Sequence, residues 1–270
     1  MAEKAMLIDT SLCMGCRGCQ IACKQWWQQG VVETTQTGSY QNPPDLNWQT
    51  WSLLRFSETE IDGKLHFMFA KDQCRHCADP SPCSMGCEAG AISKNEHGGV
   101  VVDQSKCVGD CEMECAQYCP YDVLKPEISA EGESYCRVFK CKMCVDRLDA
   151  GKKPACAATC PTGAISFGDK TDVVTQAEAR LAEVQANYPD AEIYPDTDGN
   201  AMWLLMASNV DYQLASRQDH PDLKTDEAQR PLLAAGDLLR SPILAAGCTF
   251  VGAMEALRYR KNKLADSTEE

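Results

Sequence analysis

The sequence predicts an α+β protein in which short β-hairpins and short helices surround repeated sets of four cysteines. Three observations predict this class. Eighteen cysteines stand among 270 residues, and sixteen of them form four quartets. The segments beside the quartets combine apolar runs with turn residues, as short strands and hairpins do. The stretch after residue 170, which contains a single cysteine, begins with apolar residues at helical spacing.

The composition narrows the chemistry of these cysteines. A net charge of −13 disfavours nucleic acid as a partner, because phosphate binding requires concentrated Lys and Arg. Disulfide frameworks belong mainly to short secreted chains, whereas MAEKAMLIDTSLC at the start predicts no secretory signal. Structural zinc sites usually join two C-x2-C knuckles, while these cysteines come in fours. Iron–sulfur clusters are therefore the interpretation that the pattern favours.

The spacing within the quartets indicates how they combine. A bacterial ferredoxin run is C-x2-C-x2-C-x3-C-P, in which the fourth cysteine ligates the other cluster of a pair. Proline follows only the third and fourth quartets, at Pro120 and Pro161. We therefore expect each quartet without proline to exchange its fourth cysteine with a quartet that has one. The quartets are Cys13, Cys16, Cys19 and Cys23; Cys74, Cys77, Cys83 and Cys87; Cys107, Cys111, Cys115 and Cys119; and Cys141, Cys144, Cys156 and Cys160.

This exchange predicts four [4Fe-4S] clusters, one at each of four sites. Site 1 is Cys13, Cys16, Cys19 and Cys160; site 2 is Cys141, Cys144, Cys156 and Cys23; site 3 is Cys74, Cys77, Cys83 and Cys119; site 4 is Cys107, Cys111, Cys115 and Cys87. The pairing nests one double-cluster module inside another. The third quartet has three residues between successive cysteines, which also suits one face of a helix with packed thiols. At site 4, a helix with packed thiols is therefore the alternative to a cluster.

The flanking segments are assigned in chain order. KAMLID before the first quartet and HFMFAKD before the second predict entering strands. EAGAIS, the turn EHGG and VVVD predict a β-hairpin after Cys87, and the string GAIS recurs after Cys160. AMWLLMA predicts a buried strand, and Pro189 ends a predicted helix. The apolar positions of that helix are Val174, Ala177, Leu181, Val184 and Tyr188.

These elements predict two ferredoxin-like double-[4Fe-4S] modules with a C-terminal helical extension. The predicted parts are an outer module of residues 1–24 and 136–170, an insertion at 25–72, an inner module at 73–135, a packing extension at 171–230, and a C-terminal helix with a charged tail at 231–270.

Several residues near the quartets are expected to have other roles. Cys136 and Cys248 fall outside the quartets, and isolated cysteines are usually buried and inert. His76 stands between two ligands, but Rieske centres place two histidines on one iron, so we expect at most a contact with a ligand. Four tryptophans are expected in the core or at a subunit interface, since aromatic residues dominate both. They are Trp26, Trp27, Trp48 and Trp51.

The chain resembles the iron–sulfur β subunits of formate dehydrogenases, among the electron-transfer subunits of the molybdopterin oxidoreductase superfamily. The matching strings are CMGCRGCQIACKQWW, TGSYQNPPDLNWQTWSLLRFSETE, CRHCADP and RVFKCKMCVDRLDAGKKPACAATCPTGAISFGDK. The quartets alone also suit nitrate, dimethyl sulfoxide and polysulfide reductase subunits. The segment from QNPPDL to RFSETE and the spacer between Cys144 and Cys156 favour formate dehydrogenase. Soluble members of this group can carry one cluster fewer, and site 4 is where such a loss would fall.

The resemblance implies an electron relay with no catalysis of its own, and the sequence shows no catalytic constellation. A catalytic α subunit with a molybdenum or tungsten bis-pterin would exchange electrons with formate. This chain would pass them to an external acceptor or to a cytochrome- or quinone-linked membrane subunit. The alternatives are a subunit of a polysulfide or dimethyl sulfoxide type reductase, and a free polyferredoxin.

Location is predicted from the family and the C-terminus. The uncharged run 241–254 spans roughly 21 Å as a helix, short of the ~30 Å hydrocarbon core, and RYRKNK follows it. We expect an amphipathic helix packed on a partner, with a short membrane anchor as the alternative. The family precedent predicts a soluble or peripheral periplasmic complex, exported folded with its catalytic subunit; the alternative is cytoplasmic.

Overall fold

The computed structural model describes residues 2–61, 63–107, 111–128, 134–194, 199–207 and 212–214. The chain divides into two units, residues 1–223 and 224–270, and the described residues all belong to the first. The predicted C-terminal helix, Cys248 and the side chain of Cys136 lie outside the described residues. No helix in the described part of the chain is long and apolar enough to cross a membrane.

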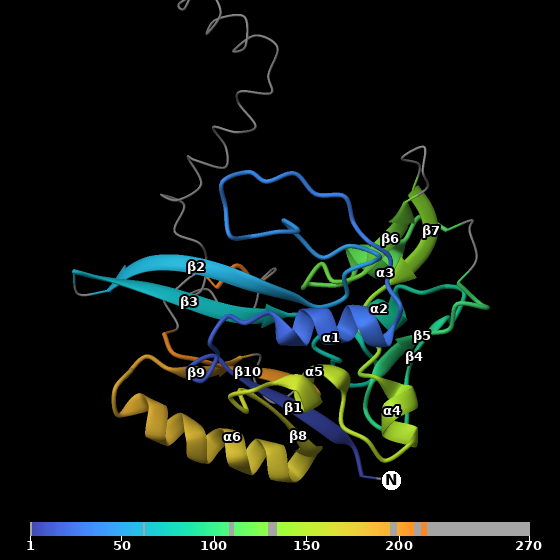
Figure 1. The fold of residues 1–270 in the computed structure, drawn as a ribbon. Helices are drawn as coiled ribbons and strands as arrows, with labels where there is room; N and C mark the ends of the chain where they lie inside the picture. Colours follow the sequence, from blue (N-terminus) through green and yellow to red (C-terminus); the bar gives the residue numbers. More distant parts are fainter. Residues whose placement is uncertain are drawn as a thin grey trace, which may run out of the picture. The chain divides into compact units, whose positions relative to one another are not determined.

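A four-stranded sheet forms the base of the first unit (Figure 1). Its strands are β1 (Lys4–Asp9), β8 (Ile165–Asp169), β9 (Glu192–Tyr194) and β10 (Ala201–Leu205), in the order β8-β1-β10-β9. β1 runs antiparallel to β8 and parallel to β10. The predicted strands KAMLID and AMWLLMA are thus confirmed, and they lie side by side in one sheet.

The sheet is buried on both faces, which explains why β1 and β10 are apolar at nearly every position. Alternate side chains of a strand point to opposite faces. Ala5 and Leu7 pack with Met202 and Leu204 against α6 (Lys170–Gln185). Met6, Ile8, Ala201, Trp203 and Leu205 face the other way, into a core that includes Cys19 and Cys156. One face of the sheet therefore holds a helix, and the other faces cysteines.

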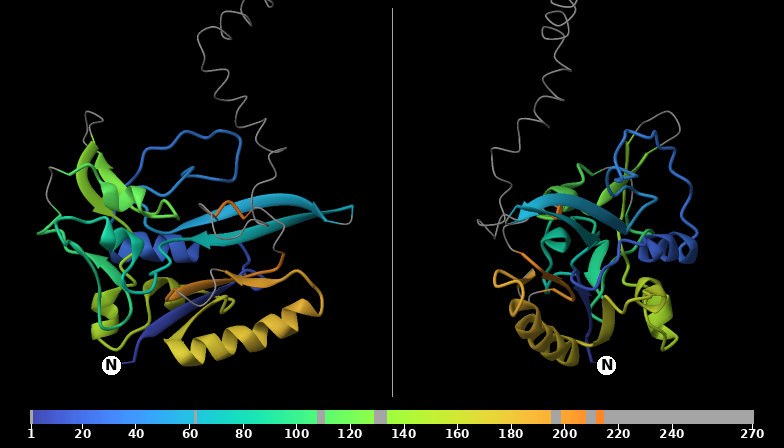
Figure 2. Two further views of the ribbon diagram at one scale, coloured as in Figure 1. Left: turned by 180° about the vertical axis from the view of Figure 1, so that it is seen from behind. Right: turned by 60° about the vertical axis from the view of Figure 1, so that its left-hand side comes forward.

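Helix α6 confirms the predicted helix beyond residue 170. Its buried residues are Val173, Ala177 and Val184, while Val174 and Leu181 pack at the edge of the same core. The helix ends at Gln185, before Tyr188, which also packs at that edge. Figures 1 and 2 show α6 on one side of the sheet and the hairpin β2–β3 on the other.

Three two-stranded hairpins and five short helices make up the rest of the described structure. The hairpins are β2 (Leu53–Ile61) with β3 (Lys64–Asp72), β4 (Ile92–Lys94) with β5 (Val100–Val102), and β6 (Lys125–Ile128) with β7 (Ser134–Phe139). The helices are α1 (Gly18–Trp26), α2 (Pro82–Met85), α3 (Glu114–Gln117), α4 (Val145–Asp149) and α5 (Ala155–Thr159). The predicted hairpin after Cys87 is confirmed as β4–β5. The α+β class is also confirmed, since a few mostly short helices accompany small and mainly antiparallel sheets in the described part of the chain.

Candidate iron–sulfur cluster sites

The structure brings the cysteines of site 1 together where the loop after β1 meets the end of α5. Cys13 and Cys16 lie in that loop, Cys19 lies on the first turn of α1, and Cys160 directly follows α5. All four line one cavity of about 390 Å³ together with apolar side chains such as Ile8. Burial raises the pKa of Cys19 to about 12, so this thiol keeps its proton at neutral pH unless a metal displaces it.

The cysteines of site 2 are all buried, which is true of no other set. Cys23 lies on α1, Cys141 and Cys144 precede α4, and Cys156 lies on α5. Burial raises the pKa of Cys144 to about 12, and the charges of Cys141 and Cys156 add to this effect. The same neighbours raise the pKa of Cys23, again after burial. The four thiol groups are thus close enough to influence one another.

The cysteines of site 3 line a cavity of about 290 Å³ with Val100, Leu124 and other apolar residues. Cys74 and Cys77 follow β3, Cys83 lies on α2, and Cys119 follows α3. Burial raises the pKa of Cys77 to about 12. Cys74 differs: burial raises its pKa, but a neighbouring histidine and lysine lower it more strongly, to about 5. Cys74 is therefore favoured as a thiolate.

The cysteines of site 4 line a further cavity, of about 390 Å³, together with Ala91 and Ile92 at the start of β4. Cys87 follows α2, and Cys115 lies on α3, which is only four residues long. Cys107 and Cys111 both stand outside helices, on either side of the undescribed residues 108–110. The described residues of the third quartet therefore do not form one continuous helix with the cysteines on one face. Burial and the charge of Cys87 raise the pKa of Cys115 to about 12.

The separation of the sulfur atoms distinguishes clusters from single metal ions. Four thiolates around one zinc ion, at Zn–S distances of about 2.3 Å, bring the sulfurs to about 3.8 Å from one another. Among the described residues, no three cysteines have their sulfur atoms within 4.8 Å of one another. A cluster holds its thiolates further apart, because iron and sulfide lie between them. The cysteines of sites 1 to 3 also form no disulfide.

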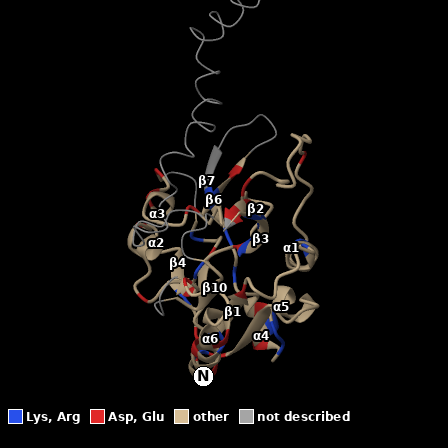
Figure 3. Ribbon diagram, turned by 90° about the vertical axis from the view of Figure 1, so that its left-hand side faces the viewer, with Lys and Arg blue, Asp and Glu red and all other residues tan. Residues whose placement is uncertain are grey.

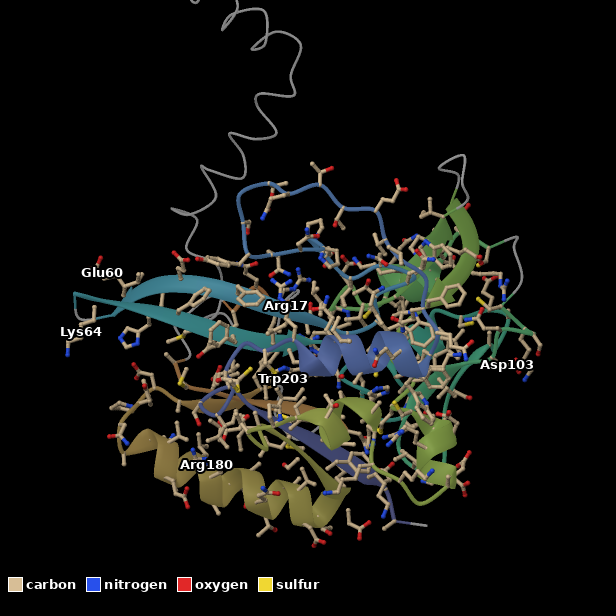
Figure 4. All side chains as sticks on the ribbon, in the orientation of Figure 1. Arg17, Glu60, Lys64, Asp103, Arg180 and Trp203 are labelled. Carbon is tan, nitrogen blue, oxygen red and sulfur yellow. The ribbon has the colours of Figure 1, made fainter. Side chains whose placement is uncertain are left out.

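Strand β10 holds the loop that carries the first cysteines of site 3. Asn200 N–H donates to the carbonyl of His76, and Ala201 N–H donates to that of Arg75, both at 3.0 Å. A Cβ atom on Gly199 would stand 2.8 Å from the Arg75 carbonyl oxygen, closer than a side chain tolerates, so glycine permits this close approach. Trp203, labelled in Figure 4, is fully buried and donates Nε1–H to the Lys71 carbonyl at 2.6 Å. β10 is thereby tied to both β3 and the loop after it.

Two buried lysines stand among the cysteines, and the sequence did not single them out. Lys71 lies at the end of β3, lines the cavity of site 1 and bonds Gln73. Burial lowers the pKa of Lys71, but the thiolate charges of sites 1 and 2 raise it above its ordinary value. Lys140 donates to the carbonyls of Val100 and Cys141. Lysine is almost never fully buried without a partner, and here the partners include sulfur.

Lys140 and Lys71 act on different sites. Lys140 lowers the pKa of Cys74 and Cys83 in site 3, while Lys71 acts on sites 1 and 2. Figure 3 shows Lys and Arg within the fold near β3. A lysine immediately before a cysteine run is a weak sequence signal for this arrangement, because only the fold shows that its side chain points inward.

The tryptophans of the insertion have mixed environments. Trp51 is buried, and its ring lies 5.6 Å from that of Trp27, with the Lys142 ammonium about 5 Å from both rings. Trp27 also opposes the rise in the pKa of Cys144 of site 2. Trp26 is 40% exposed, with the Arg147 guanidinium 4.3 Å above its ring. The expected core role thus holds for Trp51, whereas Trp26 is on the surface.

Comparison with known proteins shows what this arrangement is similar to. Residues 65–170 match the family model described as a 4Fe-4S dicluster domain. The formate dehydrogenase β subunit of Megalodesulfovibrio gigas is 42% identical over 207 residues, covering 75% of this chain and 93% of that protein. The iron–sulfur subunit of the nitrate-inducible formate dehydrogenase of Escherichia coli is 37% identical over 280 residues, 100% of this chain and 90% of that protein. Formate dehydrogenase 2 subunit β (cytochrome c-553) of Nitratidesulfovibrio vulgaris is 38% identical over 215 residues, covering 77% of this chain and 96% of that protein.

Proposed function

Because this chain belongs to the family of iron–sulfur β subunits of formate dehydrogenases, we propose that it relays electrons through four [4Fe-4S] clusters, one at each of sites 1 to 4. It is an electron-transfer subunit and not a catalytic one. The three relatives described above are all subunits of formate dehydrogenases, which disfavours both a free polyferredoxin and a subunit of another reductase. The observation that carries the proposal is the gathering of cysteines from distant quartets around separate apolar cavities.

The donor set at each site fits a [4Fe-4S] cluster. Each site offers four thiols, the ligands such clusters require, and the sulfur atoms are too far apart for one zinc ion. Apolar side chains make up much of the lining of the cavities of sites 1, 3 and 4. A bound cluster would supply one-electron redox chemistry. The exchange of Cys23 and Cys160 between the first and fourth quartets supports an outer double-cluster module, and that of Cys87 and Cys119 supports an inner one.

Contacts between sites support a single row in the order 1, 2, 3, 4. The charge of Cys156 of site 2 raises the pKa of Cys19 of site 1, although burial is the larger cause. The charge of Cys74 of site 3 acts in the same direction on Cys141 of site 2, and that of Cys83 of site 3 on Cys115 of site 4. Electrostatic influence of this kind requires short separations. Each site thus has a neighbour on the way from one end of the row to the other.

Burial of the thiols and the charges of two lysines determine how these sites hold negative charge. Most of the thiols whose pKa is shifted have it raised by burial, as at Cys19, Cys77 and Cys115. Ligation must therefore displace protons that the fold otherwise retains. Lys71 and Lys140 place positive charge beside the sulfurs of sites 1 to 3, which offsets the negative charge that thiolates bring into a buried region.

The partners and the location complete the proposal. The names of the relatives imply a catalytic α subunit, which on this proposal holds a molybdenum or tungsten bis-pterin. The N. vulgaris relative is named with cytochrome c-553, which supports a cytochrome-type acceptor for this chain. We place the complex in the periplasm, soluble or peripheral at the membrane. Fractionation checks this: retention of the chain in a cytoplasmic fraction would contradict it.

Metal analysis tests the cluster assignment directly. The anaerobically purified chain should contain about sixteen iron and sixteen sulfide ions, four of each per site. Replacing Cys160 with Ala should remove the cluster of site 1, which uses Cys13, Cys16 and Cys19, and leave site 2 intact. Spectroscopic loss of the site 2 cluster instead would show that the fourth cysteines are not exchanged. Stoichiometric zinc in place of sulfide would contradict the whole proposal.

A further inference from the structure

Arg75 is a fully buried arginine beside site 3, and the electron relay proposed above gives it no role. It stands between Cys74 and His76 and is 0% exposed. The loop that carries it is held by its backbone: His76 N–H donates to the Cys74 sulfur at 3.4 Å, the contact with a ligand expected of this histidine, and Ala201 N–H donates to the Arg75 carbonyl at 3.0 Å. Arginine is always charged in proteins, and a buried charge needs partners.

The hydrogen bonds of Arg75 satisfy only part of its guanidinium. Nη1 donates to the Asp72 carboxylate at 2.8 Å and to the Gln73 carbonyl at 2.5 Å. Nε and Nη2 are buried and have no hydrogen-bond partner in the described part of the chain. Asp72 also accepts from the buried Arg55 at 2.8 Å, so one buried carboxylate serves two buried guanidinium groups. The second carboxylate on Arg55, that of Asp45, is half exposed. Positive charge is therefore in excess at the buried end of this network.

Two aromatic rings contact the Arg75 guanidinium and fix it beside site 3. Its central carbon lies 4.7 Å from the centre of the Tyr121 ring and 4.5 Å from that of the Trp203 ring. Tyr121 comes two residues after Cys119, and Tyr121, Cys119 and Arg75 all line the cavity of site 3. The rings and the ion pair with Asp72 thus hold a positive charge at the wall of this cavity.

The cavity of site 3 is where negative charge can offset this excess. Arg75 is the only charged residue among the described residues that line it, and the remainder are mostly cysteines and apolar residues. Four thiolates would bring negative charge into this cavity together with a cluster. Attraction between that charge and the guanidinium is strong in a buried region of low dielectric.

We propose that Arg75 is the buried counter-charge of site 3, and that its guanidinium, held by Tyr121 and Trp203, raises the reduction potential of the cluster bound there. This inference rests on the proposed four-cluster relay. One electron adds one negative charge to a cluster, so a fixed positive charge nearby stabilises the reduced form more than the oxidised form. Net charge is one of the factors that determine cluster potentials.

The test compares Arg75→Met with the unchanged complex of this chain and its catalytic subunit. Methionine fills part of the space of the arginine without its charge, and Asp72 keeps Arg55 as a partner. Potentiometric titration followed by EPR should show the site 3 cluster shifted to lower potential by more than any other cluster. We expect roughly a tenfold loss in its reduction equilibrium, which is about 59 mV for one electron. Cys83→Ala removes a proposed ligand of site 3 and identifies the EPR signal of this cluster by its absence.

Two further variants separate the charge of Arg75 from its contribution to folding. Arg75→Lys keeps the positive charge and should keep the potential of site 3 close to that of the unchanged complex. Arg55→Met is the matched control, because Arg55 is also buried and bonds the same Asp72. Arg55 is not among the described residues that line the cavities of sites 1, 3 and 4, so its loss should shift the site 3 potential much less.

The inference is overturned if Arg75→Met leaves the potential of site 3 unchanged, or if Arg55→Met shifts it equally. If Arg75→Met loses iron, Arg75→Lys decides the question: a site 3 cluster at its normal potential supports the inference, and loss of iron there too overturns it. Failure of the underlying relay looks different, because the unchanged complex itself would then hold far fewer than about sixteen iron ions per chain.

Discussion

The middle and the ends of the proposed row differ in how far the protein encloses them. At site 2 all four cysteines are buried, whereas sites 1 and 4 each have one exposed cysteine, Cys16 and Cys111. The ends also carry exposed apolar side chains: Met14 is 60% exposed beside site 1, and Tyr118 is 56% exposed near site 4. On the proposed relay, electrons would enter and leave at the ends, where a cysteine is exposed, while all four cysteines of site 2 are buried.

The same difference shows in the supporting structure. Site 2 lies against α1 and α5 and the buried face of the four-stranded sheet. Site 4 is lined by Ile92 of the short strand β4 and by loop residues, and two of its cysteines flank the undescribed residues 108–110. A cluster in the middle should therefore depend on the fold as a whole, and a cluster at an end on a local loop.

Removing the cluster in the middle of the row should reduce electron transfer more than any other change. Replacing Cys156 with Ala removes a buried cysteine of site 2 and should lower the iron content by about four ions per chain. Transfer of electrons from formate to the physiological acceptor should be lost, because the row is interrupted. Reduction of an artificial dye directly by the catalytic subunit should persist.

The matched control for this experiment is Cys136→Ala, which changes a cysteine outside the four quartets. It should keep all the iron and the full transfer rate. Undiminished transfer to the natural acceptor in Cys156→Ala would mean that electrons bypass site 2, and that the row is not the path.

Exposure to air should separate the ends from the middle without any substitution. Susceptibility to oxidation follows exposure, so the clusters of sites 1 and 4 should be destroyed before those of sites 2 and 3. Iron measured against time should fall in two phases of about eight ions each, with EPR identifying the survivors. Loss of all the iron in a single phase would show that burial does not protect the middle.

Removing the charge of a buried lysine should have a smaller effect on the relay than losing a cluster. It should lower the reduction potentials of only the clusters beside that lysine. Lys71→Met keeps the length of a side chain that lies beside sites 1 and 2. A buried charge a few ångströms away, at an effective dielectric of about 20, contributes on the order of 2 kcal/mol. The reduction equilibria of the two clusters should therefore fall roughly thirtyfold, as measured by potentiometric titration.

Lys64→Met, on the exposed start of β3, is the control for this substitution and should leave every potential unchanged. Equal shifts at all four clusters in Lys71→Met would show a general disturbance of the fold instead of a local charge effect.

These contrasts also show what the sequence could and could not predict. KAMLID, HFMFAKD, the hairpin after Cys87 and the helix after residue 170 follow from local periodicity, and all are present. The two prolines predicted which quartets exchange their fourth cysteines; those ligand sets stay a prediction, supported by the cavities the cysteines line. The parallel pairing of β10 with β1 could not be predicted, because it joins segments nearly 200 residues apart. The role of Lys71 also could not be predicted, since local sequence does not show which way a polar side chain points.

The smallest effect on the relay should come from the far face of the sheet. Val184 is 4% exposed and packs in the core between α6 and the sheet, apart from the face that holds cysteines. Val184→Ala removes two methyl groups and leaves a small cavity, which should lower the free energy of unfolding by about 1–3 kcal/mol. Because the sheet itself is retained, the iron content and all four potentials should stay unchanged. Thermal unfolding and potentiometric titration of one preparation check both halves of this expectation. A shift in the potentials of sites 1 and 2 in this variant would contradict it, and would show that the sheet transmits packing changes from α6 to the clusters.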